Sequence, residues 1–319
     1  MFNFCTSIRQ YCMISDLFKN TRPVNFLILL VMMIITMLFY QFFIFHSKWD
    51  LGNILQSLAI IVLLIINLFM VNFIDKKNDL TENNAYVILL FSVMLAFFPY
   101  IYDSLNIIIS HTFILLALRR IVSMRSMKTI KLKIFDAVFW ISVASFFFSW
   151  SLLFLVLVFF AILLYAPRDY KNWLVPLLSI ATVWILYCTV AILLNQPIQG
   201  IASITPQWDW DIDRFMQLRY MIPMGFLSVI GGWALLLYFL GIGEKSGKYQ
   251  NELLIVISAF LIGVGIALGA EENHGAETMF IMFPLAVIIA CFLEKIRRNW
   301  IRELIFWIFL FLPLVALML

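Results

Sequence analysis

The stretch VNFLILLVMMIITMLFYQFFIF at residues 24–45, followed by NILQSLAIIVLLIINLFMVNFI at residues 53–74, decides the fold class of this chain. Neither run contains a charged residue, and each is long enough for an α-helix to cross a bilayer, which takes about twenty apolar residues. Of the 319 residues, 64% are hydrophobic and only 13% are charged. Soluble domains are about one-quarter charged, so the sequence predicts an all-α integral membrane protein.

The same apolar pattern continues along the chain. We predict eleven spans, at residues 24–45, 53–74, 85–101, 104–119, 134–149, 151–166, 174–194, 222–242, 251–270, 278–294 and 303–319. The third to sixth spans are short. The third and fourth meet at Pro99–Asp103, and the fifth and sixth meet at Ser149–Ser151. Each short pair is either two full spans or a re-entrant hairpin, and both interpretations return the chain to the side it left.

The basic residues orient these spans. Nineteen of the 22 Lys and Arg residues fall on the side of the N-terminus, and only Lys48, Arg214 and Arg219 fall on the other side. Cytoplasmic loops carry the excess of Lys and Arg, so we predict a cytoplasmic N-terminus and an outer C-terminus in a bacterial inner membrane. The outer face carries more acids than bases. The net charge of +4 comes from the basic inner face, and nucleic acid is therefore not an expected partner.

Outside the spans no stretch is long enough for an independent core. We therefore predict a cytoplasmic segment at 1–23 and one polytopic membrane domain at 24–319. Two interpretations of residues 1–12 stay open: an over-long gene prediction with Met13 as the true start, or a short interfacial helix. The cysteines, at positions 5, 12, 188 and 291, form neither a disulfide framework nor a metal-binding spacing. No nucleotide-binding, hydrolase or zinc-protease motif is present.

The longest predicted outer loop, Asn195–Met221, contains Asp209, Asp211 and Asp213 alternating with Trp208, Trp210 and Ile212. In an extended segment the carboxylates would share one face. They could then bind sugar hydroxyls or a divalent cation, although the spacing departs from a calcium loop. The alternative is an interfacial loop with Trp anchors and solvated acids.

Arg214 and Arg219 are two of the three outer cations, and Arg219 lies where the eighth span begins. A guanidinium at a helix start suits a lipid phosphate, because its fork binds two oxygens and the helix terminus favours an anion. The alternative is an arginine that extends to the lipid headgroups or pairs with a loop acid.

The densest polar cluster follows the ninth span, where Glu271, Glu272 and His274 lie in a short connection with small residues. A histidine near carboxylates could be a general base or a metal ligand. The alternative is a polar surface turn. Asp50 after the first span and Asp103 after the third are lone acids at outer helix ends, where they act in chemistry, cap a helix or are solvated. We expect His111, about two turns into the fourth span, to be a packing residue.

Two resemblances follow from these residues. The segments ISDLFKN at 14–20, RPVNF at 22–26 and FIMFPLAVIIA at 280–290 resemble an uncharacterised bacterial inner-membrane family of unknown function. The architecture also resembles the GT-C superfamily, which transfers sugars from polyprenyl-phosphate donors on the outer leaflet. The similar features are the inside N-terminus, the acid after the first span, the basic inner loop after the fourth and the long outer loop after the seventh. The short first outer loop departs from that superfamily.

The GT-C resemblance implies a polyprenyl-phosphate-dependent glycosyltransferase, or a degenerate relative, in envelope glycan or lipid assembly. Asp50 would then be the acid or base toward the acceptor, and Arg219 would bind the lipid phosphate. Glu271, Glu272 and His274 would complete an outer cavity. The expected partners are membrane lipids, a polyprenyl-phosphate-linked sugar and other envelope proteins.

Two other functional classes stay open. One is a non-catalytic scaffold subunit of an envelope or secretion complex. The other is a transporter or flippase, which is expected to carry charges at mid-membrane, whereas the charges here lie at span ends.

Overall fold

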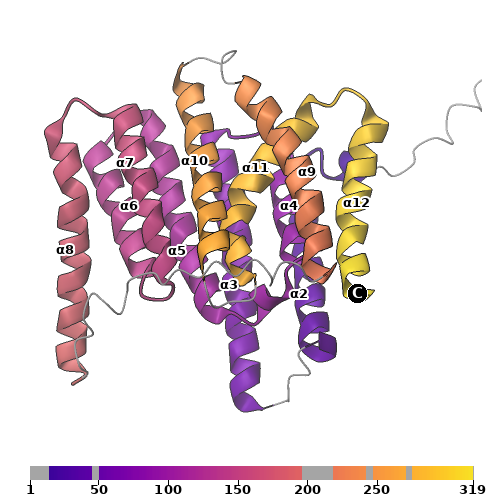
Figure 1. The fold of residues 1–319 in the computed structure, drawn as a ribbon, viewed down its shortest axis with the longest axis horizontal. Helices are drawn as coiled ribbons and strands as arrows, with labels where there is room; N and C mark the ends of the chain where they lie inside the picture. The colour runs from indigo at the N-terminus through magenta and orange to yellow at the C-terminus, as the bar shows by residue number, and fades with distance from the viewer. Residues whose placement is uncertain (1–13, 45–49, 196–217, 242–246, 271–274, 319) are drawn as a thin grey trace, which may run out of the picture.

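The computed structural model describes residues 14–44, 50–195, 218–241, 247–270 and 275–318, and every regular element in these ranges is helical. The long helices α2 to α12 lie side by side and run alternately up and down (Figure 1). The α-helices are α1 (Ile14–Leu17), α2 (Pro23–Phe39), α3 (Leu51–Asn78), α4 (Tyr86–Leu95), α5 (Leu105–Val122), α6 (Ile130–Ala144), α7 (Phe154–Tyr165), α8 (Tyr170–Leu193), α9 (Leu218–Leu240), α10 (Gly247–Gly269), α11 (Met279–Lys295) and α12 (Asn299–Met318).

Short helical turns complete the bundle. They are the π-helix η1 (Tyr40–Ile44) and the 3-10 helices η2 (Pro99–Tyr102), η3 (Ser123–Ser126), η4 (Ser149–Leu153) and η8 (Ala276–Thr278). The turns η2 and η4 lie where the predicted short spans meet. Pro at the start of η2 cannot continue a helical hydrogen-bond ladder, which explains why α4 ends before it.

The count of long helices matches the eleven predicted segments in the described residues. Seven helical segments there are long and apolar enough to cross a membrane, while α4 and the η4–α7 segment are apolar but shorter. The coarse prediction of an all-helical chain with many membrane-spanning candidates is therefore confirmed.

Two helices occupy the centre of the bundle. Every residue of α4 is buried, and nearly every residue of α11 is buried too. In contrast, α2, α3, α8 and α9 bury a single stripe and expose large apolar side chains on the other side. A helix that is apolar all round is stable either inside a protein or against lipid, so neighbouring helices decide which of the two applies.

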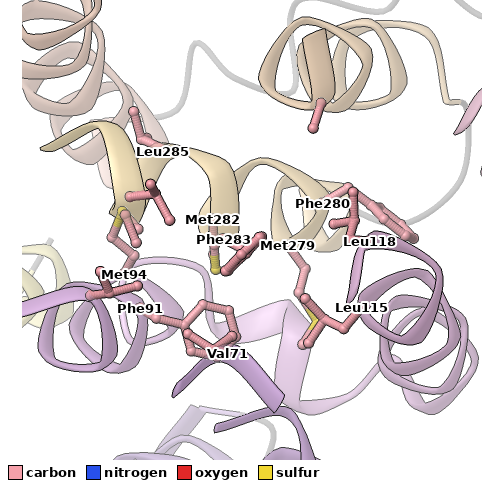
Figure 2. Close-up of a cluster of buried hydrophobic side chains, with 14 of the residues drawn as sticks. Val71, Phe91, Met94, Leu115, Leu118, Met279, Phe280, Met282, Phe283 and Leu285 are labelled. Atoms are coloured by element: carbon pink, nitrogen blue, oxygen red, sulfur yellow. The ribbon is translucent and has the colours of Figure 1, made fainter. Parts of the chain in front are cut away.

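The central helix α11 packs against α4, α9 and α10, and it also contacts α5. Met279, Met282 and Phe283 of α11 lie in one buried cluster with Phe91 of α4 and Leu115 of α5 (Figure 2). The ring of Phe280 lies 5.5 Å from that of Phe148, centroid to centroid, and 5.7 Å from the His111 ring. Lipid tails are as apolar as these side chains, so close van der Waals packing is what holds such helices together.

Charged residues gather at one end of the bundle, at the top of Figure 1. Two ion pairs connect elements there: Arg125 of η3 with Glu252 of α10, distant in the sequence, at 3.0 Å, and Arg120 of α5 with Asp136 of the next helix, α6, at 2.9 Å. Arg125 Nη1 also donates to the carbonyl of Asn78, which ties the end of α3 to η3 and α10. The cations at this end include Lys76, Lys77, Arg119, Arg120, Arg125, Lys128, Lys131, Lys133, Arg168, Lys171, Lys295, Arg297, Arg298 and Arg302. This end corresponds to the predicted inner face, and we call the opposite end the outer end.

Candidate functional site

The turn η2 at the outer end is held in place by hydrogen bonds and ring stacking. Tyr102 is fully buried, and its hydroxyl lies 3.2 Å from Thr36 Oγ1 on α2. The Tyr40 ring stacks on Tyr102 at 5.8 Å, and the Tyr40 hydroxyl donates to the carbonyl of Ala96 at 2.8 Å. These contacts hold η2 against α2 and η1, so it forms a rigid base for the groups around it.

Three further elements meet η2. It packs against η8, and the Tyr100 ring lies 6.0 Å from the Tyr220 ring of α9. Gln56 Nε2 of α3 donates to the Asp103 carbonyl at 3.4 Å. The outer ends of α3, α9 and η8 are thereby gathered around one turn, although they are far apart in the sequence.

Asp103 and Asp50 lie at different heights along the axis of α3. Asp103 is exposed beside η2. Asp50 is exposed at the start of α3, where its Oδ1 accepts a hydrogen bond from the Leu51 N–H at 2.9 Å. Six residues of helix separate Asp50 from Gln56, or about 9 Å along the axis. Asp50 therefore lies beyond Asp103, on the end of α3 that extends below the bundle in Figure 1.

Most of the other predicted site residues lie outside the described residues. These are Asp209, Asp211, Asp213, Arg214, Glu271, Glu272 and His274. Arg219 is in the first turn of α9, and its side chain is likewise outside the described part. Its neighbour Tyr220 is buried against η2, which puts the start of α9, but not the guanidinium, beside that turn.

Glu277 is the outer residue that sequence reasoning did not select. It lies in η8 and is fully buried. The preceding Gly275 has φ of 93°, a conformation that favours glycine, and Thr278 Oγ1 donates to the Gly275 carbonyl at 2.7 Å. Carboxylates are rarely buried unless they are held by other groups. The sequence feature that could have pointed to Glu277 is Gly275, two residues before it in a short connection.

A partly open apolar groove begins beside η8. Its volume is about 190 Å³, and α4, α9, α10 and α11 form its walls. Thr278 and Leu268 lie at its outer end, and Leu285 lies about two turns deeper. Ser228 on α9 supplies the other hydroxyl in an otherwise apolar lining. A second apolar groove of about 250 Å³ lies between α2, α4 and α12.

His111 belongs to the interior and not to this end. It is buried, as expected, and its Nδ1 lies 2.9 Å from Asn67 Oδ1. Asn67 Nδ2 donates in turn to Thr112 Oγ1 at 2.8 Å. Each polar group thus has a partner at a depth where an unpaired one is costly, and the cluster joins α3 to α5.

The described residues hold no group of three or more His, Cys, Asp or Glu side chains close enough to bind a metal ion. Two groups were predicted as candidates for a divalent cation: the three aspartates at 209, 211 and 213, and the cluster of Glu271, Glu272 and His274. Both lie outside the described residues. The described geometry supplies instead an apolar groove whose outer end adjoins a buried carboxylate and a helix start.

The fold defines a class: an all-helical protein with several helices that are long and apolar enough to cross a membrane. Residues 13–318 match the model of a family of unknown function, DUF6427, and the chain belongs to this family. The expected resemblance to an uncharacterised family is thereby confirmed. No curated protein matches the chain, and no solved structure does.

Proposed function

We propose that this chain is an inner-membrane protein of eleven spans, with a cytoplasmic N-terminus and an outer C-terminus, that binds a long-chain phosphate lipid at its outer end. Its activity is that of a GT-C-like, polyprenyl-phosphate-dependent glycosyltransferase, or a degenerate relative, in envelope glycan or lipid assembly. The observation that carries the proposal is the groove between α4, α9, α10 and α11.

The groove supports a lipid ligand through its shape and chemistry. Its lining is almost wholly apolar, and it is confined to the outer half of four helices. A prenyl or acyl chain fits such walls, because binding sites for apolar groups bury them against apolar side chains. A chain lying there would carry its phosphate toward η8 and the first turn of α9, which contains Arg219.

We assign the remaining roles from the sequence. Arg219 and the start of α9 bind the lipid phosphate. A general base, Asp50 or the Glu272–His274 pair, takes the proton of the acceptor hydroxyl as its oxygen bonds to the anomeric carbon of the sugar. The bond from that carbon to the phosphate oxygen breaks, and the lipid phosphate leaves. Glu277 adds a buried carboxyl group next to Thr278 of the groove lining.

Filling the groove tests the proposal. Ser228→Trp puts a large ring into the groove, whereas Val229→Trp puts the same ring on the adjacent, 72% exposed position. We expect Ser228→Trp to lower binding of a fluorescent polyprenyl phosphate at least about tenfold, since one lost apolar contact of that size is worth more than 1.4 kcal/mol. Val229→Trp should bind like the native protein. Equal binding by both variants, with normal thermal unfolding, would show that the groove is not the lipid site.

A scaffold subunit is the second candidate, and α3 favours it. This helix has 28 residues and is about 42 Å long at 1.5 Å per residue, against a hydrocarbon layer of about 30 Å. Its first turns expose Leu51 and Leu55 beyond the bundle. Such an end could hold another envelope protein.

A further inference from the structure

A second, wider cavity lies at the inner end, away from the proposed lipid groove. It has a volume of about 690 Å³ and is an open basin between the start of α6 and the connection from α7 to α8. Lys131, Arg168 and Asp169 supply its charged lining, and Tyr165 and Asn172 supply buried polar lining. The proposed function at the outer end makes no use of this basin.

The amino end of α6 opens into the basin without a capping side chain. Thr129 precedes the helix with φ of 50°, and its hydroxyl donates backward to the Lys128 carbonyl at 2.8 Å. The first N–H groups of a helix have no partner within it, and those of Ile130, Lys131 and Leu132 belong to residues that line the basin. Such a terminus attracts an anion.

Two buried polar atoms belong to residues of the basin lining. The Tyr165 hydroxyl and the Asn172 Oδ1 have no hydrogen-bond partner among the described residues. The Asn172 amide nitrogen is already engaged, because it donates to the Ala166 carbonyl at 3.2 Å. A buried polar atom without a partner is unfavourable, so a ligand that reaches a donor at Tyr165 and an acceptor at Asn172 gains both hydrogen bonds.

The charges at the rim favour a ligand with one negative charge. Lys131 pairs with Asp169 at 3.0 Å, and this pair lowers the pKa of the Asp169 carboxyl, which also accepts from the Lys171 N–H. Arg168 is exposed and has no ion-pair partner among the described residues. With Lys131 neutralised by Asp169, Arg168 leaves the basin with one net positive charge.

We propose that this basin binds the phosphodiester of an anionic phospholipid with a hydroxylated headgroup, such as phosphatidylglycerol, at the inner surface of the membrane. The phosphate lies between Arg168 and the start of α6. Headgroup hydroxyls donate to Asn172 Oδ1 and accept from the Tyr165 hydroxyl. Leu132 and Met127, which are 64% and 51% exposed, contact the glycerol and the upper acyl chains.

The test uses the full-length protein in a neutral detergent, titrated with phosphatidylglycerol or phosphatidylcholine, with bound lipid counted by native mass spectrometry. We expect tighter binding of phosphatidylglycerol. Arg168→Gln should weaken it about tenfold, since a hydrogen-bonded charge is lost, and Tyr165→Phe should weaken it roughly three- to tenfold. The matched controls are Arg297→Gln, an exposed cation of the same end outside the basin, and Tyr170→Phe, an exposed hydroxyl next to it. Both controls should change binding less than about twofold.

Glycerol 1-phosphate identifies the source of the phosphate. Competition by this soluble compound at millimolar concentration means that the basin takes a free phosphoester, and absence of competition means that it takes the membrane lipid. The proposal is overturned if Arg168→Gln binds phosphatidylglycerol like Arg297→Gln, or if phosphatidylcholine binds equally well. Should Tyr165→Phe fail to fold, Arg168→Gln decides alone, because Arg168 is exposed and can be changed without disturbing the core.

Discussion

Asp50 shows how two roles can share one side chain. Its carboxylate begins α3 and accepts from the Leu51 N–H, which is sufficient reason for an acid at this position. Asn caps a helix start about as well as Asp. The change Asp50→Asn therefore removes the negative charge and any acid–base chemistry while leaving the cap, and it separates the two roles more cleanly than Ala would.

Arg219 provides the residue-scale prediction. If its guanidinium binds a lipid phosphate, Arg219→Lys keeps the charge but loses the two-pronged geometry, and it should damage function almost as badly as Arg219→Ala. Loss of a charge-assisted pair costs on the order of 1.5–3 kcal/mol, or roughly ten- to a hundredfold in affinity. Complementation of a deletion strain, with protein level checked by blot, is the measurement.

The variants Asp50→Asn and Glu272→Gln help to decide what the result for Arg219→Lys means. A lysine reaches lipid headgroups as well as an arginine does, so an anchoring role predicts full complementation by Arg219→Lys. If Asp50→Asn and Glu272→Gln also complement fully, the phosphate site and the transferase are wrong. The scaffold function would then be favoured.

At the scale of elements, α10 and α11 approach closely at one glycine. A Cβ built on Gly263 would lie 2.9 Å from the Phe280 carbonyl oxygen and 3.2 Å from the Ile281 Cα. Both are backbone atoms of the central helix, so they cannot move aside as a flexible side chain could. Small residues allow this kind of contact between membrane helices.

Gly263→Ala should therefore destabilise the bundle by about 1–3 kcal/mol, as overpacking does. Gly265→Ala on the same helix is the control, because nothing lies within 4 Å of its Cβ position. Thermal unfolding in detergent, compared between the two variants, measures the difference. Equal midpoints would mean that α10 and α11 are not in contact at this glycine.

The helical segments themselves were predicted from apolar length, but their ends were predicted less well: α4 ends at Leu95, where the third span was predicted to reach residue 101, and α6 covers Ile130–Ala144, where residues 134–149 were predicted. The meeting points at Pro99 and Ser149 became η2 and η4. The positions of helices in the bundle were not predicted, since α4 and α8 are both strongly apolar while only α4 is surrounded by protein. The pair of Arg125 and Glu252 was also missed, because no local pattern connects residues so far apart in the chain.

The candidate site was predicted less fully than the fold. Sequence reasoning identified acids at outer helix ends, and Asp50 and Asp103 do lie there. It did not select Glu277, because a glycine two residues before an acid indicates a turn but does not show that the acid is buried; that burial accompanies the packing of η8 against α10, α11 and η2. The groove was missed for the same reason: its walls come from four helices that only the tertiary structure brings together.

For the whole molecule, the account depends on which end faces the cytoplasm. The end with the ion pairs and the basin is proposed to lie inside, and the end with η2, η8 and the groove is proposed to lie outside. A protein inserted the other way would present its groove to the inner leaflet. The lipid phosphate and the envelope function would then both lose their basis.

The most direct test is the labelling of single cysteines by a membrane-impermeant maleimide in intact cells, in a background without the native cysteines. Cysteine at the exposed position Asp103 should be labelled in intact cells, and cysteine at the exposed position Lys128 only after the membrane is permeabilised. A reporter that is active only outside should agree, working after Leu319 or within residues 196–206 and failing within residues 123–130. Labelling at Lys128 and not at Asp103 in intact cells would contradict the account.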